Sequence, residues 1–344
     1  MKKITIYLLC IAGLLAAAGC AKEPVTGPND AAKRFMDAWI HIYNQTNGTD
    51  IKPSGLGIYV LEEKEGDSDK TVTDNGYAIV EFKTTDLTGN ISAYTSAETA
   101  KQLGAYNDTY YYGPQVWLTM DATIQAGLQE AIVGMKVGGS KKVVIPSWLM
   151  TYSSYDDADK YLAKETSGSN AIYEFTVKDF TDSINVWQID SIERYIVKNY
   201  GDIKSFSNDT TGFYYRQISA PADDEKFSSD TTIYINYTGR LLNGLVFDTN
   251  IERVAKDNGL YDPKKTYEPS SIKWGEKHGD LTMGTGSSTV ISGFSLTLWQ
   301  MKAMEKGIGI FYSPLGYGSS GSGSSIPAYS PLIFEIEIVE KPED

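Results

Sequence analysis

The stretch Ile233–Asp248, with the sequence IYINYTGRLLNGLVFD, decides the fold of the chain. Apolar and aromatic residues alternate with polar ones between Ile233 and Tyr237, which predicts a strand with one buried face. Asn243-Gly244 then predicts a hairpin, because both residues tolerate a positive φ. The stretch is therefore expected to form two antiparallel strands.

The second strand of this hairpin ends on Phe247-Asp248. A carboxylate next to an apolar wall is typical of a position that faces a ligand. The alternative is that Asp248 only caps a turn together with Thr249. Both interpretations stay open from these residues alone.

The N-terminus has the pattern of an export signal. Two lysines precede an apolar run, Ile4–Leu15, which is too short to span a membrane, so we expect residues 1–19 to be a signal peptide. The run ends on Ala17-Ala18-Gly19-Cys20, which resembles the lipobox of bacterial lipoproteins and implies a lipid on Cys20. A signal peptide cleaved without lipidation is the alternative.

The lipobox interpretation predicts an exported lipoprotein of a bacterium, anchored at the outer membrane and facing the periplasm or the cell surface. Residues 20–28 would be the lipidated tether. Cys10 lies in the cleaved segment, so the mature chain would have no free thiol for a disulfide framework or a thiolate metal site.

The charge of the chain is acidic. Its formal net charge is -13, and removal of residues 1–19 with their two lysines makes it -15. This balance argues against a nucleic-acid partner, because such binding requires basic residues that neutralise phosphates. It also disfavours adhesion to anionic lipid, so we expect membrane contact through the lipid anchor only.

A helix is predicted from Asn29 or Asp30 onward, with Phe35, Trp39 and Ile42 on one buried face. The partner of that face could be the following domain or a second copy of the chain, which would make a homodimer.

The order of helix, strand, turn and strand occurs twice. Strands are predicted within 54–63 and 77–82, and again within 211–218 and 231–237. Before the second pair, a helix is predicted from a cap at Asp182 to Tyr200, with Gly201 as its stop. This repeat of about 150 residues predicts tandem domains at 29–181 and 182–344. Each would be an α+β domain with a short helix across antiparallel strands.

The second copy resembles the FKBP-type peptidyl-prolyl cis-trans isomerases over about residues 211–340. Met301 and Tyr317 keep the family's spacing of sixteen positions. The residues that carry the resemblance are Tyr237-Thr238-Gly239, Gly244, Phe247-Asp248, Val290-Ile291-x-Gly293-Phe294, Met301, Tyr317-Gly318, Ile326-Pro327 and Leu332-x-Phe334.

The resemblance implies a twisted antiparallel sheet wrapped around one short helix, with an apolar pocket between them. It places Asp248 and Tyr317 as a polar pair at the rim, beside Phe247, and lets the Tyr317 hydroxyl donate to a substrate carbonyl. It assigns substrate contacts to Tyr237, Val290, Ile291, Phe294, Ile326 and Phe334. The family often has tryptophan where this chain has Phe294.

Isomerisation of an X-Pro bond requires no nucleophile, metal or cofactor, and we expect none. An apolar pocket favours the twisted amide over the planar one, and a few fixed hydrogen bonds hold the peptide. His41 and His278 are the two histidines of the chain, and no carboxylates accompany them at spacings typical of zinc. The chain also lacks the G-x-S-x-G and G-x-x-x-x-G-K-[ST] motifs of hydrolases and nucleotide-binding proteins.

Two departures from the family pattern concern the pocket. An insertion is expected at about 249–280, which could cover or reshape the pocket, and either Leu281 or Met283 could supply the next wall. In the first copy Tyr94-Thr95 stands where Phe-Asp is expected, and Leu128 replaces the aromatic floor. We therefore expect activity in the second domain and little or none in the first.

The sequence thus predicts an isomerase that acts on proline-containing, unfolded or exported polypeptides and assists their folding. A non-catalytic, chaperone-like lipoprotein that binds peptides is the main alternative. A surface lipoprotein whose Tyr and Trp residues bind glycans is a third interpretation.

Overall fold

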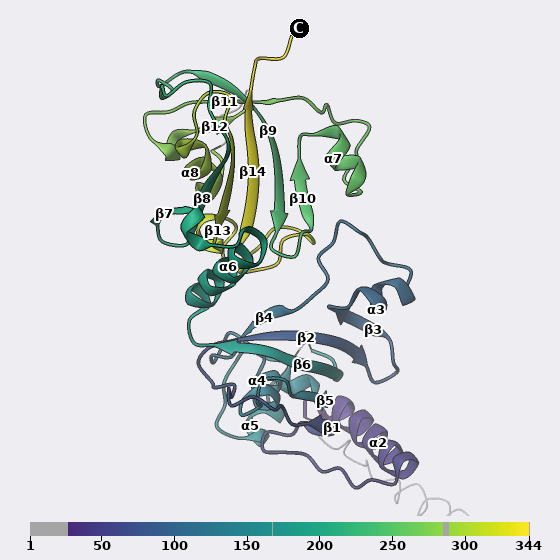
Figure 1. Cartoon of the computed structure of the whole chain (residues 1–344). Helices are drawn as coiled ribbons and strands as arrows, with labels where there is room; N and C mark the ends of the chain where they lie inside the picture. The colour runs from purple at the N-terminus through teal and green to yellow at the C-terminus, as the bar shows by residue number, and fades with distance from the viewer. Residues whose placement is uncertain (1–26, 167, 285–288, 344) are drawn as a thin grey trace, which may run out of the picture.

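The computed structural model describes residues 27–166, 168–284 and 289–343. The predicted signal peptide and Cys20 lie outside the described residues. Two antiparallel sheets, each with its own helices, make up the described chain (Figure 1). Among the residues described, no helix combines the length and apolarity needed to span a bilayer.

The first sheet has six strands in the order β1-β5-β6-β2-β3, and β4 also pairs with β2. Its strands are β1 (Tyr59–Lys64), β2 (Tyr77–Asp86), β3 (Ile91–Tyr94), β4 (Gln115–Leu118), β5 (Ser140–Ile145) and β6 (Ala171–Thr181). The helices of this half are α2 (Asp30–Asn47), α3 (Ala97–Gln102), α4 (Ala126–Ile132) and α5 (Ala158–Leu162), with a 3-10 turn at Ser147–Leu149.

The second sheet has eight strands in the order β12-β11-β9-β14-β13-β8-β7, and β10 also pairs with β9. Its strands are β7 (Ser207–Thr210), β8 (Phe213–Ser219), β9 (Thr232–Leu241), β10 (Val246–Thr249), β11 (Ser270–Lys273), β12 (Thr282–Met283), β13 (Lys306–Phe311) and β14 (Leu332–Val339). The helices are α6 (Ile184–Tyr200), α7 (Glu252–Asp257) and α8 (Ser292–Gln300), with 3-10 turns at Ile203–Ser205, His278–Asp280 and Ser313–Leu315.

The two sheets share one connectivity. The path β1-β5-β6-β2 with two further strands on β2 matches the path β8-β13-β14-β9 with two further strands on β9. A short helix packs on each sheet, α4 against β5 and α8 against β13 and β14. The predicted α+β fold, in two copies with a short helix across each antiparallel sheet, is confirmed. We call residues 29–181 the first domain and 182–344 the second domain.

The hairpin predicted for Ile233–Asp248 is present and consists of β9 and β10. Gly244 in its turn has a φ of 93°, a conformation that favours glycine. The register changes between Val246 and Asp248, so that Phe247 occupies a bulge. A bulge re-aims the side chains on either side of it, which brings Phe247 and Asp248 to the end of the sheet's inner face.

The apolar face predicted for the first helix is only partly the one that packs on the domain: Trp39 contacts the core and donates to the Leu87 carbonyl, but Phe35 and Ile42 do not join it. In α2 the buried residues are Met36 and Ile40, whereas Phe35 and Ile42 are 54% and 62% exposed. The side chain of Asn29 does not cap the helix; it donates to the carbonyls of Leu162 and Lys164.

The second long helix covers the outer face of the second sheet. Ile192 and Ile196 of α6 are fully buried in a cluster with Tyr214, Ile310 and Ile333, separate from the inner core that α8 covers. The helix begins at Ile184 rather than at a cap on Asp182, and Gly201 ends it as predicted. Because apolar residues of β14 alternate between the two clusters, this sheet is buried on both faces.

The start of α6 joins the two domains. The Trp187 indole donates to the Asp179 carboxylate at 2.9 Å, which connects the helix to β6. One residue further, the buried Gln188 accepts a hydrogen bond from the Ser313 backbone N–H at 2.7 Å, next to the second sheet. Successive side chains of one helical turn therefore fix α6 to both domains.

The segment predicted as an insertion at about 249–280 contains part of the sheet. Its strand β11 pairs with β9 from Ser270↔Ile235 to Lys273↔Thr232. Trp274 is buried and stacks on Trp299 of α8, with ring centroids 5.2 Å apart. The part that lies outside the sheet is the α7 segment, which stands beside β10 (Figure 1).

Candidate functional site

An aromatic cluster lies between α8 and the inner face of the second sheet. Phe294 of α8 meets Phe334 of β14 edge to face, with centroids 5.0 Å apart, and meets Tyr237 of β9 at 5.7 Å. All three rings are more than nine-tenths buried. The aromatic residues named by the resemblance thus lie together, and Phe334 is at the centre of the cluster because it also contacts Tyr237 and Phe311.

Phe247 adds an aromatic wall at the bulge of β10. Its ring is half-buried and meets Phe334 edge to face at 5.6 Å. Gly239 of β9 makes this approach possible, because a Cβ there would lie 2.6 Å from the Phe247 ring and 2.8 Å from the Phe334 ring. A glycine in a strand interior often marks such a close approach.

A hydrogen-bonded pair stands at the edge of the aromatic floor. The Tyr237 hydroxyl donates to the Asp248 carboxylate at 2.8 Å, and the Lys265 ammonium lies 3.4 Å from the same carboxylate. Burial, followed by the negative charge of Asp248, raises the pKa of Tyr237 far above its ordinary value. Tyr237 therefore stays a hydrogen-bond donor at physiological pH, and its bond fixes the orientation of Asp248.

The other predicted site residues surround this floor. Ile326 is buried, Val290 and Ile291 pack half-buried against the same core, and Tyr317 is 36% exposed. Burial and the nearby Asp248 charge both raise the pKa of the Tyr317 phenol, so it too remains protonated. Leu281 is fully buried whereas Met283 is half-buried, and both pack on the same core.

Asn250 is a site residue that the sequence analysis missed. Its buried side chain accepts from the Tyr237 backbone N–H at 2.8 Å and donates to the Ile235 carbonyl at 2.8 Å, to the Glu268 carbonyl and to the Ser270 hydroxyl. These bonds join β9 to the chain on both sides of α7. The sequence signal that could have identified this residue is an asparagine two residues after the rim carboxylate.

The register of the first sheet locates the corresponding positions in the first domain. Thr95 accepts from the Phe82 backbone N–H as Asn250 accepts from Tyr237, so Thr95 corresponds to Asn250. Ala93 pairs with Thr84 next to a register irregularity, just as Asp248 pairs with Gly239.

The first domain therefore has Ala93 in place of Asp248 and Ser92 in place of Phe247. The sequence analysis aligned Tyr94-Thr95 with Phe247-Asp248, but in the structure this pair lies two residues after Ser92-Ala93. The first copy therefore lacks the Phe-Asp pair as predicted, but the positions concerned are Ser92 and Ala93 and not Tyr94 and Thr95.

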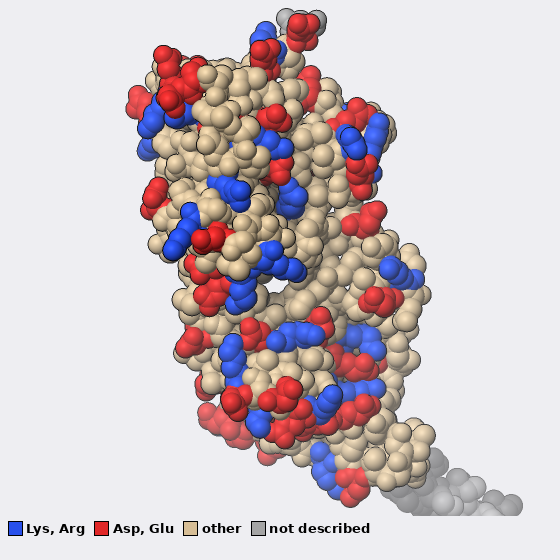
Figure 2. Space-filling view, in the orientation of Figure 1, with Lys and Arg blue, Asp and Glu red and all other residues tan. Residues whose placement is uncertain are grey.

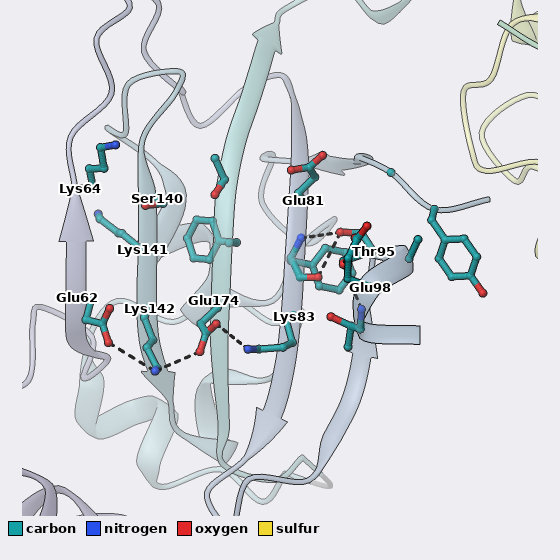
Figure 3. A pocket seen from close by; sticks show the side chains of 18 of the residues that line it. Glu62, Lys64, Glu81, Lys83, Thr95, Glu98, Ser140, Lys141, Lys142 and Glu174 are labelled. Carbon is teal, nitrogen blue, oxygen red and sulfur yellow. Dashed lines mark hydrogen bonds and ion pairs between the residues drawn. The ribbon is translucent and has the colours of Figure 1, made fainter. Parts of the chain in front are cut away.

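The first domain also has a large hollow, with a volume of 860 Å³, over the strands β1, β5, β6 and β2. Figure 3 shows the charged side chains that cross it, in the order Glu62, Lys142, Glu174 and Lys83. Successive ion pairs in this ladder measure 3.5, 3.1 and 2.9 Å. Phe82 and Phe175 also line the hollow, but the ladder of paired charges gives it a different character from the aromatic cluster of the second domain.

The sheet wrapped on one short helix, the aromatic floor and the Tyr–Asp pair are the features that the resemblance to the peptidyl-prolyl isomerases predicts. The family model described as FKBP-type peptidyl-prolyl cis-trans isomerase matches residues 223–339, which include all of these site residues. An FK506-binding protein of Neisseria meningitidis is 32% identical over 108 residues, which are 31% of this chain and 77% of that protein. The chain therefore belongs to the FKBP-type peptidyl-prolyl cis-trans isomerases.

Two further comparisons cover less of the similar protein. A probable FKBP-type peptidyl-prolyl cis-trans isomerase of Haemophilus influenzae is 30% identical over 137 residues, so this chain spans about half (46%) of that relative's length. The crystal structure of FkpA from Escherichia coli aligns with 45% of this chain and 58% of its own, with a TM-score of 0.32 and 23% identity.

Proposed function

We propose that the second domain catalyses the cis-trans isomerisation of X-Pro peptide bonds, and that its site is formed by Tyr237, Phe247, Asp248, Phe294 and Phe334. Rotation about this bond faces a barrier of about 18–20 kcal/mol, because resonance keeps the amide planar. A site that binds the twisted amide more tightly than the planar one lowers that barrier. The half-buried Phe247 ring, which packs on the aromatic floor, provides an apolar surface of this kind for the proline ring.

The observation that carries the proposal is the Tyr237–Asp248 hydrogen bond at the edge of the aromatic floor. It holds a carboxylate oriented where the peptide backbone would enter, and the exposed Tyr317 can donate to a substrate carbonyl nearby. Ala93 removes this carboxylate from the first domain, which supports placing the activity in the second.

The test is isomer exchange of several X-Pro peptides by the full chain, with Asp248→Ala and Tyr237→Phe. We expect each substitution to lower kcat/KM about 30-fold or more, since truncating a preorganised group typically costs on the order of 2–4 kcal/mol. Asp257→Ala is the matched control, because Asp257 is an exposed carboxylate of α7.

A folded chain that binds these peptides without accelerating exchange would overturn the isomerase proposal in favour of a non-catalytic, peptide-binding protein. Unchanged activity in both site variants would instead refute the assignment of the site.

We further propose that the protein acts on exported polypeptides as a lipoprotein anchored through Cys20. The sequence of residues 1–20 supports this, and incorporation of a labelled fatty acid that Cys20→Ser abolishes is the expected result. The exposed Phe35 and Ile42 of α2 offer a surface for pairing with a second copy. A dependence of sedimentation on concentration that Ile42→Ser removes would support this dimer.

A further inference from the structure

The loop 316–331 carries two of the predicted site residues, Tyr317 and Ile326. It is closed by its own backbone bonds, including Gly321 N–H to the Tyr317 carbonyl and Ser322 paired with Ile326. Tyr329 in this loop has a φ of 59°, a left-handed conformation that residues with a Cβ adopt at a cost. Such a conformation persists where surrounding contacts hold it.

One of these contacts comes from the first domain. The ring of Tyr77, the first residue of β2, meets the Tyr329 ring edge to face with centroids 5.6 Å apart. The strained residue of the site loop is therefore packed against the other domain.

A second contact comes from the segment between α3 and β4. The Tyr111 backbone N–H donates to the Ser324 carbonyl at 2.8 Å, two residues before Ile326. The Tyr111 ring packs against the core of the second domain, and burial raises the pKa of its hydroxyl, which donates to the Pro114 carbonyl at 3.1 Å. The hydroxyl also lies so close to Gly113 that a Cβ there would be 2.7 Å away.

The same segment also reaches the α7 side of the second domain. The Asp108 carboxylate lies next to Gly259, which follows α7. A Cβ added at Gly259 would be 2.6 Å from a carboxylate oxygen of Asp108. In Figure 1 the segment rises from α3 towards β10 and α7. The first domain thus contacts both the site loop and the segment that follows the rim carboxylate.

Continuous packing does not extend across this junction. An apolar cavity of 250 Å³ lies beside the contacts, bordered by Ile79, Tyr111, Trp187, Leu242 and Tyr329 among others. The coupling between the first domain and the site loop therefore depends on a few discrete contacts, chiefly those of Tyr77 and Tyr111.

We propose that Tyr77 and Tyr111 of the first domain are positioning residues for the isomerase site of the second domain. They hold the loop 316–331 so that Tyr317 and Ile326 face the substrate. The first domain lacks the rim carboxylate itself, but through these two residues it supports the site of the second domain. This inference rests on the proposed function for its catalytic consequence, but the ordering of the loop stands independently of it.

The experiment measures two quantities on the full chain: kcat/KM for X-Pro peptides and hydrogen exchange of the loop amides. We expect Tyr111→Ala and Tyr77→Ala to lower kcat/KM on the order of 2- to 30-fold, the range typical of coupling between sites. Exchange within 318–329 should accelerate while that of β14 stays slow. Tyr111→Phe keeps the ring and the backbone bond, so it should restore most of the activity.

Tyr110→Ala is the matched control, because Tyr110 is an exposed neighbour in the same segment. Tyr329→Gly tests the contact from the other side: it removes the ring and the strain together, and should loosen the loop without altering the first domain. Loop exchange equal to that of the wild type in all these variants would overturn the proposal. If the wild-type chain is inactive, the proposed function fails, and the exchange data alone decide whether the first domain orders the loop.

Discussion

Substitution of Gly239 by alanine tests whether the aromatic site is closed as tightly as the structure indicates. The added Cβ would lie 2.6 and 2.7 Å from two Phe247 ring carbons and 2.8 Å from the Phe334 ring. Carbon atoms pack best at about 3.5–4.0 Å, so the rings must move by roughly 1 Å.

The expected cost combines two effects. Overpacking a core costs about 1–3 kcal/mol, whereas replacing glycine by alanine recovers about 0.4–1 kcal/mol from the unfolded chain. We therefore expect Gly239→Ala to lower the free energy of unfolding by about 1–2 kcal/mol, measured by urea denaturation. Isomerase activity should fall as well, because the displaced rings form the pocket.

The first domain supplies the compensating change. There Thr84 stands at the position of Gly239 and Ser92 at that of Phe247, so the Cβ of Thr84 faces a small side chain where the second domain has the Phe247 ring, while Tyr173 keeps a ring at the position of Phe334. Adding Phe247→Ser to Gly239→Ala should therefore relieve the part of the clash that involves Phe247, with a coupling energy of about 0.5–3 kcal/mol in a double-mutant cycle.

Gly279→Ala is the control for this cycle, because a Cβ at Gly279 would have no neighbour within 4 Å. Equal stability of the Gly239→Ala and Gly279→Ala chains would refute the reasoning. A clash penalty that is equally large without the Phe247 ring would refute the role assigned to that ring.

Two further predictions concern buried polar groups of the second domain. Asn250→Ala should lower the free energy of unfolding by about 2–4 kcal/mol in urea denaturation, because it leaves the Tyr237 N–H and the Ile235 carbonyl without partners; an unchanged stability would contradict the hydrogen bonding described. Tyr215 is buried and donates to the Glu305 carboxylate, and burial followed by this bond raises its pKa, so the folded chain keeps a proton that the unfolded chain loses above about pH 10. Its contribution to stability is therefore complete below that pH and falls above it by about 1.4 kcal/mol per pH unit. Tyr215→Phe should flatten the measured slope by that amount, and an identical slope would contradict the raised pKa.

The aromatic site could be predicted largely from the resemblance of the second copy to the FKBP-type peptidyl-prolyl cis-trans isomerases, which assigns its residues position by position. Tyr237, Phe294 and Phe334 form the floor as expected. The hydrogen bond that orients Asp248 could not be predicted, since the bulge at Phe247 decides which way the carboxylate points.

The two errors have different origins. Thr84 to Ala93 and Gly239 to Asp248 have the same spacing and the same register irregularity, but the first copy has no Phe-Asp pair to mark its rim, so the sequence alone aligns Tyr94-Thr95 two positions away from the true counterpart. In α2, Phe35 and Ile42 form one apolar stripe and Met36 and Ile40 another, and helical periodicity does not tell which stripe the domain covers. Tertiary contacts decide that choice.

The shared helix α6 has a consequence for how the chain unfolds. Trp187 and Gln188 belong to one turn, yet their partners Asp179 and Ser313 lie in different domains. If the first domain melted alone, α6 would lose the hydrogen bond of Trp187, and if the second sheet melted, the buried Gln188 would lose its partner. Each domain therefore contributes to the stability of the start of α6, so unfolding of one should lower the melting temperature of the other.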